Sequence, residues 1–199
     1  MKTTTNIMKR FLLIALFTLS ATALFAQAGL KAGDKAPAFV AKDNTGKELD
    51  LKKLLKSNKS VVLFFYRGQW CPYCNKHIQQ LQDSLQLLTA KGAYVIGVTP
   101  ETDENIAKTV GKTKASFSMV SDKGYAIMKA YDVNYVMEQA QVNKYKGYGI
   151  DLEANNGNTD HMLPVPATYV IGKDGKLTYV HFNKDYSKRA SIKTLLSVL

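Results

Sequence analysis

Apolar and polar stretches alternate along the chain in a way that predicts strands and helices in turn. Continuous apolar runs typical of strands buried on both faces occur at 61–66, 93–98 and 167–171, and two further strands are expected at 117–120 and 177–182. Helical spacing of the apolar positions occurs at 51–55, from 72 to about 90, and at 101–110, 123–131 and 187–199. Strands that alternate with helices indicate an α/β fold whose sheet is mostly parallel and covered on both faces.

The stretch 132–165 interrupts this alternation. It contains no convincing strand, although 135–146 has the composition of a helix. Connections of this length inside compact domains are usually functional or partly disordered. We therefore expect a long insertion immediately before the strand that follows Pro166.

The first 26 residues have the features of an export signal. Three basic residues lie within the first ten, the run 11–26 is apolar, and small residues follow at Ala26 and Ala28. The alternative is an uncleaved anchor, but the apolar run is shorter than the ~20 residues that span a membrane. We expect a signal peptide over 1–26 and one exported domain over 27–199, in the periplasm or cell envelope, without a membrane span.

Composition and charge add little to this picture. The chain has 199 residues, 46 % hydrophobic and 22 % charged, which is an ordinary globular mixture. Loss of the three basic residues of the signal lowers the formal net charge from +11 to +8. The other lysines are scattered and do not interleave with aromatic residues, so a solvated basic surface is expected and a nucleic-acid partner is not.

Cys71 and Cys74 are the two cysteines of the chain, and they form a Cys-x-x-Cys where the strand 61–66 meets a helix. Amide groups at a helix N-terminus stabilise a thiolate. Pro72 suits the first helical turn and stiffens it, which supports the pair. A purely structural disulfide is the alternative, but a bridge that closes so small a loop removes little chain entropy. The spacing therefore predicts a redox-active pair.

The two thiols are expected to face different surroundings. Helical steps of four and three residues place Cys74 on the apolar face of the helix, with Ile78, Leu81, Leu85 and Leu88. Cys71 precedes the helix at the end of the loop. We therefore predict that Cys71 attacks a substrate disulfide and that Cys74 resolves the mixed disulfide, with Arg67 and Lys76 lowering the pKa of the thiols.

A metal site is a further alternative. His77 comes three residues after Cys74, and His161 and His181 are the other histidines of the chain. Two cysteines alone do not fill a structural zinc site, but a Cys-Cys-His set is able to bind copper or zinc. The redox hypothesis needs neither a metal nor another cofactor, and none is expected.

Several motifs resemble a known family. The segment 70–74 after an apolar strand looks like the active-site motif of the thioredoxin superfamily. The segments that resemble the alkyl hydroperoxide reductase/thiol-specific antioxidant (AhpC/TSA) family are 33–39, 65–74, 120–124, 165–171 and 183–186. The similarity is greatest to its peroxiredoxin-like branch with an internal Cys-x-x-Cys, which 148–152 also resembles. This resemblance implies a thioredoxin-like fold, a central mixed β-sheet flanked by helices.

The chain departs from the family at its reactive positions. Peroxiredoxins carry Pro-x-x-x-Thr/Ser-x-x-Cys, whose last cysteine attacks the peroxide. Aligned on Cys74, this chain has Arg67 for the proline and Cys71 for the Thr/Ser, and Pro166 aligns with the family's distant arginine. In thioredoxins a cis-proline opposite the cysteine pair contacts the substrate, and Pro166 stands at that place. The resemblance thus implies a substrate groove shaped by Trp70 and Pro166.

Two hypotheses for the function follow. The first is an exported thiol-disulfide oxidoreductase that acts on a disulfide-bearing protein. The second is a thiol peroxidase that reduces hydroperoxides, in which the oxidised cysteine forms a disulfide with its neighbour and a thioredoxin-like electron donor regenerates the pair. Both reactions pass through Cys71 and Cys74, since the chain has no other thiol.

Overall fold

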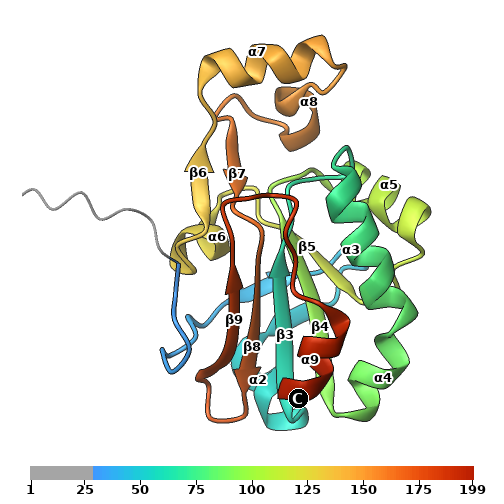
Figure 1. Ribbon diagram of the computed structural model, residues 1–199, viewed down its shortest axis with the longest axis vertical. Helices are drawn as coiled ribbons and strands as arrows, with labels where there is room; N and C mark the ends of the chain where they lie inside the picture. Colours follow the sequence, from blue (N-terminus) through green and yellow to red (C-terminus); the bar gives the residue numbers. More distant parts are fainter. Residues whose placement is uncertain (1–28) are drawn as a thin grey trace, which may run out of the picture.

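A central five-stranded sheet organises the protein (Figure 1). The structure, a computed structural model, describes residues 29–199, so the predicted signal peptide lies outside the described residues. From edge to edge the strands are β5 (Ser118–Ser121), β4 (Ala93–Thr99), β3 (Ser60–Phe65), β8 (Ala167–Gly172) and β9 (Leu177–Phe182). The strands β3, β4 and β5 are parallel, whereas β8 and β9 are antiparallel to their neighbours. The mixed sheet that the family resemblance implies is confirmed, whereas the mostly parallel sheet expected from the alternation is not, because β8 and β9 both pair antiparallel.

Helices cover both faces of this sheet, as the alternation of the sequence predicted. One face carries α3 (Pro72–Asp83), α4 (Leu85–Ala90), α5 (Asp103–Thr113) and α9 (Ile192–Val198). The other face carries α2 (Leu51–Ser57) and α6 (Ala126–Ala130). A short antiparallel hairpin, β1 (Val40–Lys42) and β2 (Glu48–Asp50), leads into α2.

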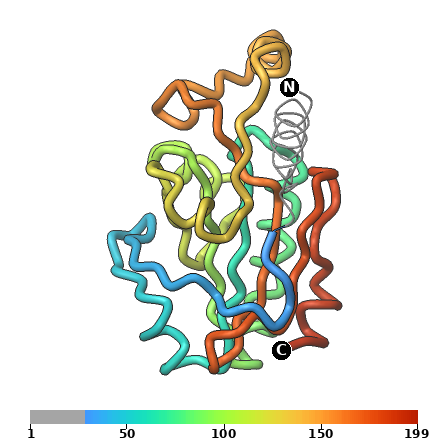
Figure 2. Tube along the Cα trace, turned by 90° about the vertical axis from the view of Figure 1, so that its left-hand side faces the viewer, coloured from blue at the N-terminus to red at the C-terminus, as the bar shows by residue number. Residues whose placement is uncertain are grey.

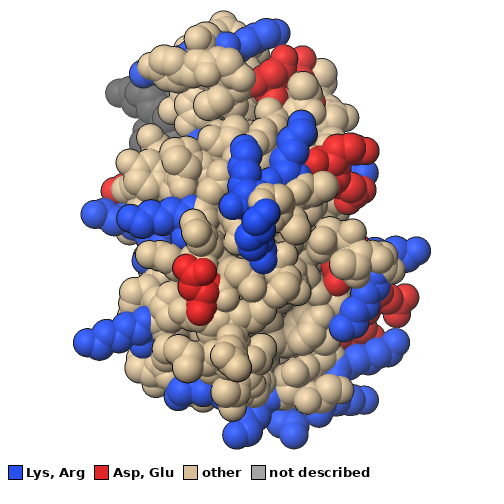
Figure 3. Space-filling model, turned by 90° about the vertical axis from the view of Figure 1, so that its right-hand side faces the viewer, with Lys and Arg blue, Asp and Glu red and all other residues tan. Residues whose placement is uncertain are grey.

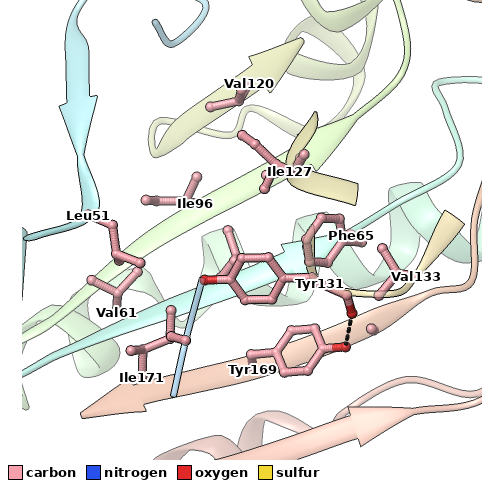
Figure 4. Packing of buried hydrophobic residues seen from close by; sticks show 14 of the residues in the cluster. Leu51, Val61, Phe65, Ile96, Val120, Ile127, Tyr131, Val133, Tyr169 and Ile171 are labelled. Carbon is pink, nitrogen blue, oxygen red and sulfur yellow. Dashed lines mark hydrogen bonds between the residues drawn. The ribbon is translucent and has the colours of Figure 1, made fainter. Parts of the chain in front are cut away.

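Alternate residues of β3 face the two layers, which makes this strand the centre of the core. Phe65 and its same-face neighbours pack with Tyr131 and Tyr169 beneath α6 (Figure 4). The hydroxyl of Tyr169 donates to the carbonyl oxygen of Tyr131 at 3.3 Å, which satisfies a polar group within this apolar layer. On the opposite face Phe64 packs against α3 through His77, with ring centroids 5.7 Å apart.

Most helices differ from their predicted bounds by a few residues, and two differences have a clear physical cause. The helix expected from 72 to about 90 breaks at Ser84, which separates α3 from α4. Serine competes with the helix backbone for hydrogen bonds and favours helix ends. The C-terminal helix, expected from 187, begins at Ile192 because Ser191 caps it by accepting from the N–H of Thr194 at 3.0 Å.

The insertion 132–165 contains two strands that the sequence analysis missed. β6 (Asn134–Val136) and β7 (Met162–Pro164) pair antiparallel. Between them in the sequence lie α7 (Gln139–Gly147) and α8 (Leu152–Asn156). Strands of three residues are too short to show a periodic pattern, which explains the error. Figures 1 and 2 show the insertion beyond the end of the sheet where β3 leads into α3.

The surface agrees with the expected dispersed basic charge. On the side that carries α3, α4 and α5, Lys and Arg side chains are spread with Asp and Glu side chains between them (Figure 3). Within residues 29–199, no helix is both long enough and apolar enough to cross a membrane.

Candidate active site

The cysteine pair lies at the predicted junction of a buried strand and a helix. Cys71 is the N-cap residue of α3, and Pro72 occupies the first helical turn. The N–H groups of Cys74 and Asn75 both donate to the carbonyl oxygen of Cys71 at 3.1 Å. The first turn of α3 therefore holds the two thiols close together, on the same side of the molecule as the insertion.

Both thiols are buried, and both are unbridged. Cys74 is 0 % exposed and shares the sheet-facing side of α3 with Ile78 and Leu81, as the periodicity predicted. Cys71, however, is only 2 % exposed, because it packs in the same apolar cluster as Cys74 and Tyr66. The two thiols were expected to face different surroundings, but both are buried, so burial does not distinguish the attacking thiol from the resolving one.

Electrostatics do distinguish the two thiols. Burial raises the pKa of Cys74, but the Cys71 thiol, the guanidinium of Arg189 and the backbone N–H of Arg67 outweigh it and lower that pKa to about 6. The hydrogen bond to Cys74 raises the pKa of Cys71, and burial raises it further. At neutral pH the pair therefore holds a thiolate at Cys74 and a thiol at Cys71.

Arg189 is the cation that contacts Cys74, and the sequence analysis did not identify it. Its Nη2 lies 3.4 Å from the sulfur, and its Nη1 donates to the carbonyl oxygens of Tyr186 and Lys188. Arg189 is half-buried in the segment between β9 and α9. Its position, 115 residues along the chain from Cys74, belongs to no motif that the sequence shows.

Arg67, a predicted site residue, is buried in an aromatic cage. It is 2 % exposed, and its Nη2 donates to the hydroxyl of Tyr145 at 2.6 Å. Its guanidinium lies 4.8 Å from the ring centroid of Trp70, 5.5 Å from that of Tyr145 and 4.5 Å from that of Tyr186. Arg67 and Trp70 thus hold α7 of the insertion, through Tyr145, against the loop that leads into the cysteine pair. Lys76, the other predicted cation, is exposed.

Pro166 lines a cavity of about 340 Å³ between the insertion and the segment after β9. The lining residues are Tyr135, Gln141, Val165, Pro166, Lys184 and Tyr186. Tyr186 connects this cavity to the cysteine loop through its contact with Arg67. No peptide bond within residues 29–199 is cis, so Pro166 differs in this respect from the thioredoxin pattern. Its contact with substrate stays a prediction.

The histidines do not join the thiols in a metal-binding group. Burial lowers the pKa of His77 to about 3, with further lowering by Arg189 and His181, so its ring is neutral. His161 instead contacts Glu153, with Nε2 and Oε1 2.9 Å apart. Within the described part of the chain, no group of three or more His, Cys, Asp or Glu side chains is placed to hold a metal ion. The copper or zinc alternative gains no support.

Glu101 is a second residue that the sequence analysis missed. It lies two residues after the end of β4, is fully buried, and accepts a hydrogen bond from the N–H of Gln69 at 2.8 Å. Burial raises the pKa of Glu101 to about 8; the Gln69 N–H lowers it and the Cys74 thiolate raises it. The sequence signal that could have identified Glu101 is an acidic residue shortly after a buried strand, at the end of the sheet where the carboxyl ends of parallel strands lie together.

Comparisons of the sequence with known proteins find one family model and several curated relatives. The sequence model described as the AhpC/TSA family matches residues 32–180. Peroxiredoxin Q from the chloroplast of Sedum lineare is 27% identical over 163 residues, 82% of this chain and 75% of that protein. A putative peroxiredoxin of Mycobacterium tuberculosis is 25% identical over 154 residues, 77% of this chain and 86% of that protein.

Solved structures share the fold. Peroxidoxin BcpB from Mycobacterium tuberculosis superposes with a TM-score of 0.65 at 21% identity, over 85% of this chain and 96% of that one. The thioredoxin domain of a thiol-disulfide oxidoreductase from Bacteroides vulgatus gives a TM-score of 0.55 at 18% identity, over 79% and 93% of the two chains. At these identities the likeness concerns the fold alone.

Proposed function

Because the chain belongs to the AhpC/TSA family, we propose that it is a peroxiredoxin-type thiol peroxidase in which Cys74 attacks the hydroperoxide. Membership of the family confirms the expected peroxiredoxin-like chain and a thiol-dependent redox enzyme. Of the two hypotheses for the reaction, the peroxidase is the better supported, since curated relatives over most of the chain are peroxiredoxins. The disulfide oxidoreductase lacks comparable support.

One observation carries the choice of attacking thiol. Arg189 donates to the sulfur of Cys74, which holds the thiolate that nucleophilic attack requires. Cys74 is also the residue that aligns with the attacking cysteine of the family. In the family an arginine at the position of Pro166 supplies the guanidinium. Here Arg189, in the segment after β9, supplies it.

The reaction divides between the two cysteines. The Cys74 thiolate attacks the terminal oxygen of the hydroperoxide, the O–O bond breaks, and the leaving oxygen takes a proton to become an alcohol or water. Cys74 is then a sulfenic acid. The Cys71 thiol attacks its sulfur, water leaves, and a Cys71–Cys74 disulfide forms. Two electrons from an external dithiol restore the pair, and a thioredoxin-like protein is the donor that we propose.

Rapid mixing of the reduced protein with hydrogen peroxide tests this function. We expect oxidation whose rate is proportional to the peroxide concentration and which consumes one peroxide per Cys71–Cys74 disulfide formed. Dithiothreitol, compared at the same thiolate concentration, serves as the unactivated control. Oxidation no faster than this control would reject the peroxidase.

A disulfide oxidoreductase is the second candidate, and the position of Cys71 favours it. Cys71 replaces the family's Thr/Ser and forms a Cys-x-x-Cys with Cys74 at a helix N-terminus, an arrangement suited to dithiol exchange. Turnover of a protein disulfide by the reduced chain, at a rate that exceeds its oxidation by peroxide, would favour this function over the peroxidase.

We further propose that the protein acts outside the cytoplasm, in the periplasm or cell envelope. The proposal depends on the basic start and apolar run of residues 1–26. N-terminal sequencing of the protein recovered from its native compartment tests it, with a start near residue 27 expected and an intact Met1 as the contrary result.

A further inference from the structure

Glu101 is a buried carboxyl group beside the cysteine pair that the reaction described above does not use. Its Oε1 accepts from the N–H of Gln69, while its Oε2 has no hydrogen-bond partner within residues 29–199. The carbonyl oxygen of Gln69 in turn accepts from Nδ2 of Asn75 in the first turn of α3 at 2.8 Å. The carboxyl group is thus fixed against the loop that carries both thiols.

Gly68 allows this close approach. A Cβ atom at this position would lie 2.6 Å from Oε1 of Glu101 and 2.5 Å from Nε1 of Trp70. Real Cβ atoms do not approach other atoms so closely, so the glycine makes room for the carboxyl group and the indole together. The space at Gly68 therefore lets the Glu101 carboxyl group pack directly against the loop that leads into the cysteine pair.

Within the described residues no cation forms an ion pair with Glu101, although the charges of Lys112 and Lys108 lower its pKa. The charged and titratable groups that face it are Cys74 on α3, Lys108 and Lys112 on α5, and Tyr66 after β3. The two lysines make their hydrogen bonds elsewhere: Lys108 donates to Oδ1 of Asn105 at 2.9 Å, and Lys112 donates to the carbonyl oxygen of Gln69 at 3.2 Å. A buried site that already holds the Cys74 thiolate does not readily take a second negative charge, so Glu101 holds a proton in the reduced protein.

The charge of Cys74 contributes to this protonation. Burial is the main cause that raises the pKa of Glu101 to about 8, and the Cys74 thiolate adds to it. When Cys74 enters a disulfide, the thiolate charge disappears and its contribution is lost. Oxidation of the pair therefore makes Glu101 a stronger acid, by the reciprocity of coupled titrations.

The reaction consumes one proton that neither the cysteine pair nor the hydroperoxide supplies. The reduced pair at neutral pH consists of one thiolate and one thiol. Its conversion with ROOH into a disulfide, ROH and water needs three hydrogens. The hydroperoxide brings one and the Cys71 thiol brings one, so a third proton must come from the protein or from the solvent.

We propose that Glu101 holds the third proton: the negative charge of the buried site moves from the Cys74 sulfur to the Glu101 carboxylate on oxidation and returns on reduction. Thiolate, thiol, carboxylic acid and ROOH then give disulfide, carboxylate, ROH and water, with atoms and charge balanced and no net proton from solvent. Glu101 acts by taking up the negative charge that leaves Cys74, as a positioning residue. The inference rests on the proposed function only in taking Cys71 and Cys74 as the redox pair.

Proton counting in weakly buffered solution near neutral pH tests the inference. An indicator dye follows the protons exchanged with solvent while dithiothreitol reduces the disulfide and, in a separate run, while hydrogen peroxide forms it. We expect close to zero protons per disulfide for the wild-type protein in both runs. For Glu101→Gln we expect one proton released on reduction and one taken up on peroxide oxidation. One proton per disulfide in the wild type as well would overturn the inference.

Two variants control this experiment. Glu101→Asp retains a carboxyl group and is expected to restore the wild-type proton balance. Asp122→Asn removes another buried carboxyl group, which accepts from the N–H groups of Ile127 and Met128 at the start of α6, and is expected to leave the balance unchanged. An equal change in Asp122→Asn would mean that the effect is not specific to Glu101, and would also overturn the inference.

A measurement on the wild-type protein guards against a variant that fails to fold. The infrared difference spectrum between the reduced and disulfide forms should show the loss of one protonated carboxylic acid on oxidation; an unchanged carboxylic acid band contradicts the inference. The dithiothreitol run is independent of peroxidase activity. Slow peroxide oxidation with the expected proton balance would reject the proposed function alone, whereas fast oxidation with one proton taken up would reject the role of Glu101 alone.

Discussion

Replacement of Cys74 by serine abolishes fast peroxide reduction, whereas replacement of Cys71 by serine preserves the first step and stops the reaction at a sulfenic acid. This is the largest effect that we expect of any substitution. Cys74 carries the thiolate because Arg189 and the Cys71 thiol donate to its sulfur. In Cys71→Ser a hydroxyl replaces the thiol as donor, so the Cys74 thiolate stays stabilised, while no second sulfur is present to close the disulfide.

Rapid mixing with hydrogen peroxide measures both variants. We expect the rate for Cys74→Ser to fall about thirtyfold or more, because a thiol with an ordinary pKa is only a few per cent thiolate at neutral pH. For Cys71→Ser, a dimedone adduct that peptide mass spectrometry locates at residue 74 identifies the sulfenic acid. Fast oxidation of Cys74→Ser together with an inert Cys71→Ser would restore Cys71 as the attacking thiol.

Replacement of Arg189 by glutamine raises the pKa of Cys74 and slows its oxidation. Hydrogen bonds to charged groups contribute about 1.5–3 kcal/mol, and one pKa unit corresponds to about 1.4 kcal/mol. Because Arg189 is half-buried, solvent screens part of its charge, and we expect the lower end of this range, about one pKa unit. The smaller thiolate fraction and the lost contact between Arg189 and Cys74 together predict a rate of peroxide oxidation about fivefold to tenfold lower at neutral pH.

The pH profile of peroxide oxidation separates this effect from a change in packing. Its midpoint is expected to move to higher pH in Arg189→Gln and to recover in part in Arg189→Lys. Lys188→Gln, which removes the adjacent exposed cation, serves as the control and should keep the wild-type midpoint. If Arg189→Gln and Lys188→Gln have the same profile as the wild type, the contact between Arg189 and Cys74 has no role in holding the thiolate.

The sequence predicted the scaffold well because burial leaves a strong pattern. The apolar run that becomes β3 marks the central strand, and the helical spacing from Cys74 to Leu81 marks the face of α3 that packs on the sheet. Pro72 and the cysteine spacing place the pair at the helix start. These features are local in the sequence, so no knowledge of the tertiary structure is needed to find them.

The roles of the two thiols depend on contacts that are not local. Helix periodicity predicted that Cys74 is shielded, and we therefore expected it to be the resolving thiol. Shielding alone does raise the pKa of a thiol, but the hydrogen bond from Cys71 and the guanidinium of Arg189, which approaches from the segment before α9, together outweigh it. Neither Arg189 nor Glu101 belongs to a motif around the cysteines, and only the folded chain brings them together there.

The insertion illustrates a different limit. The strands β6 and β7 have three residues each, too few for periodicity to identify, yet they flank the segment whose helix α7 contacts Arg67 and Trp70. The contact that completes this arrangement joins Arg67 to Tyr145, 78 residues apart. Sequence spacing shows neither the pairing nor the contact.

The central claim is that Cys74, and not Cys71, is the thiolate of the resting enzyme. Titration of thiolate ultraviolet absorbance in the reduced wild-type protein and in Cys74→Ser tests it most directly. We predict a midpoint near pH 6 in the wild type that is absent from Cys74→Ser. A midpoint near pH 6 that persists in Cys74→Ser would assign the thiolate to Cys71 and contradict the account.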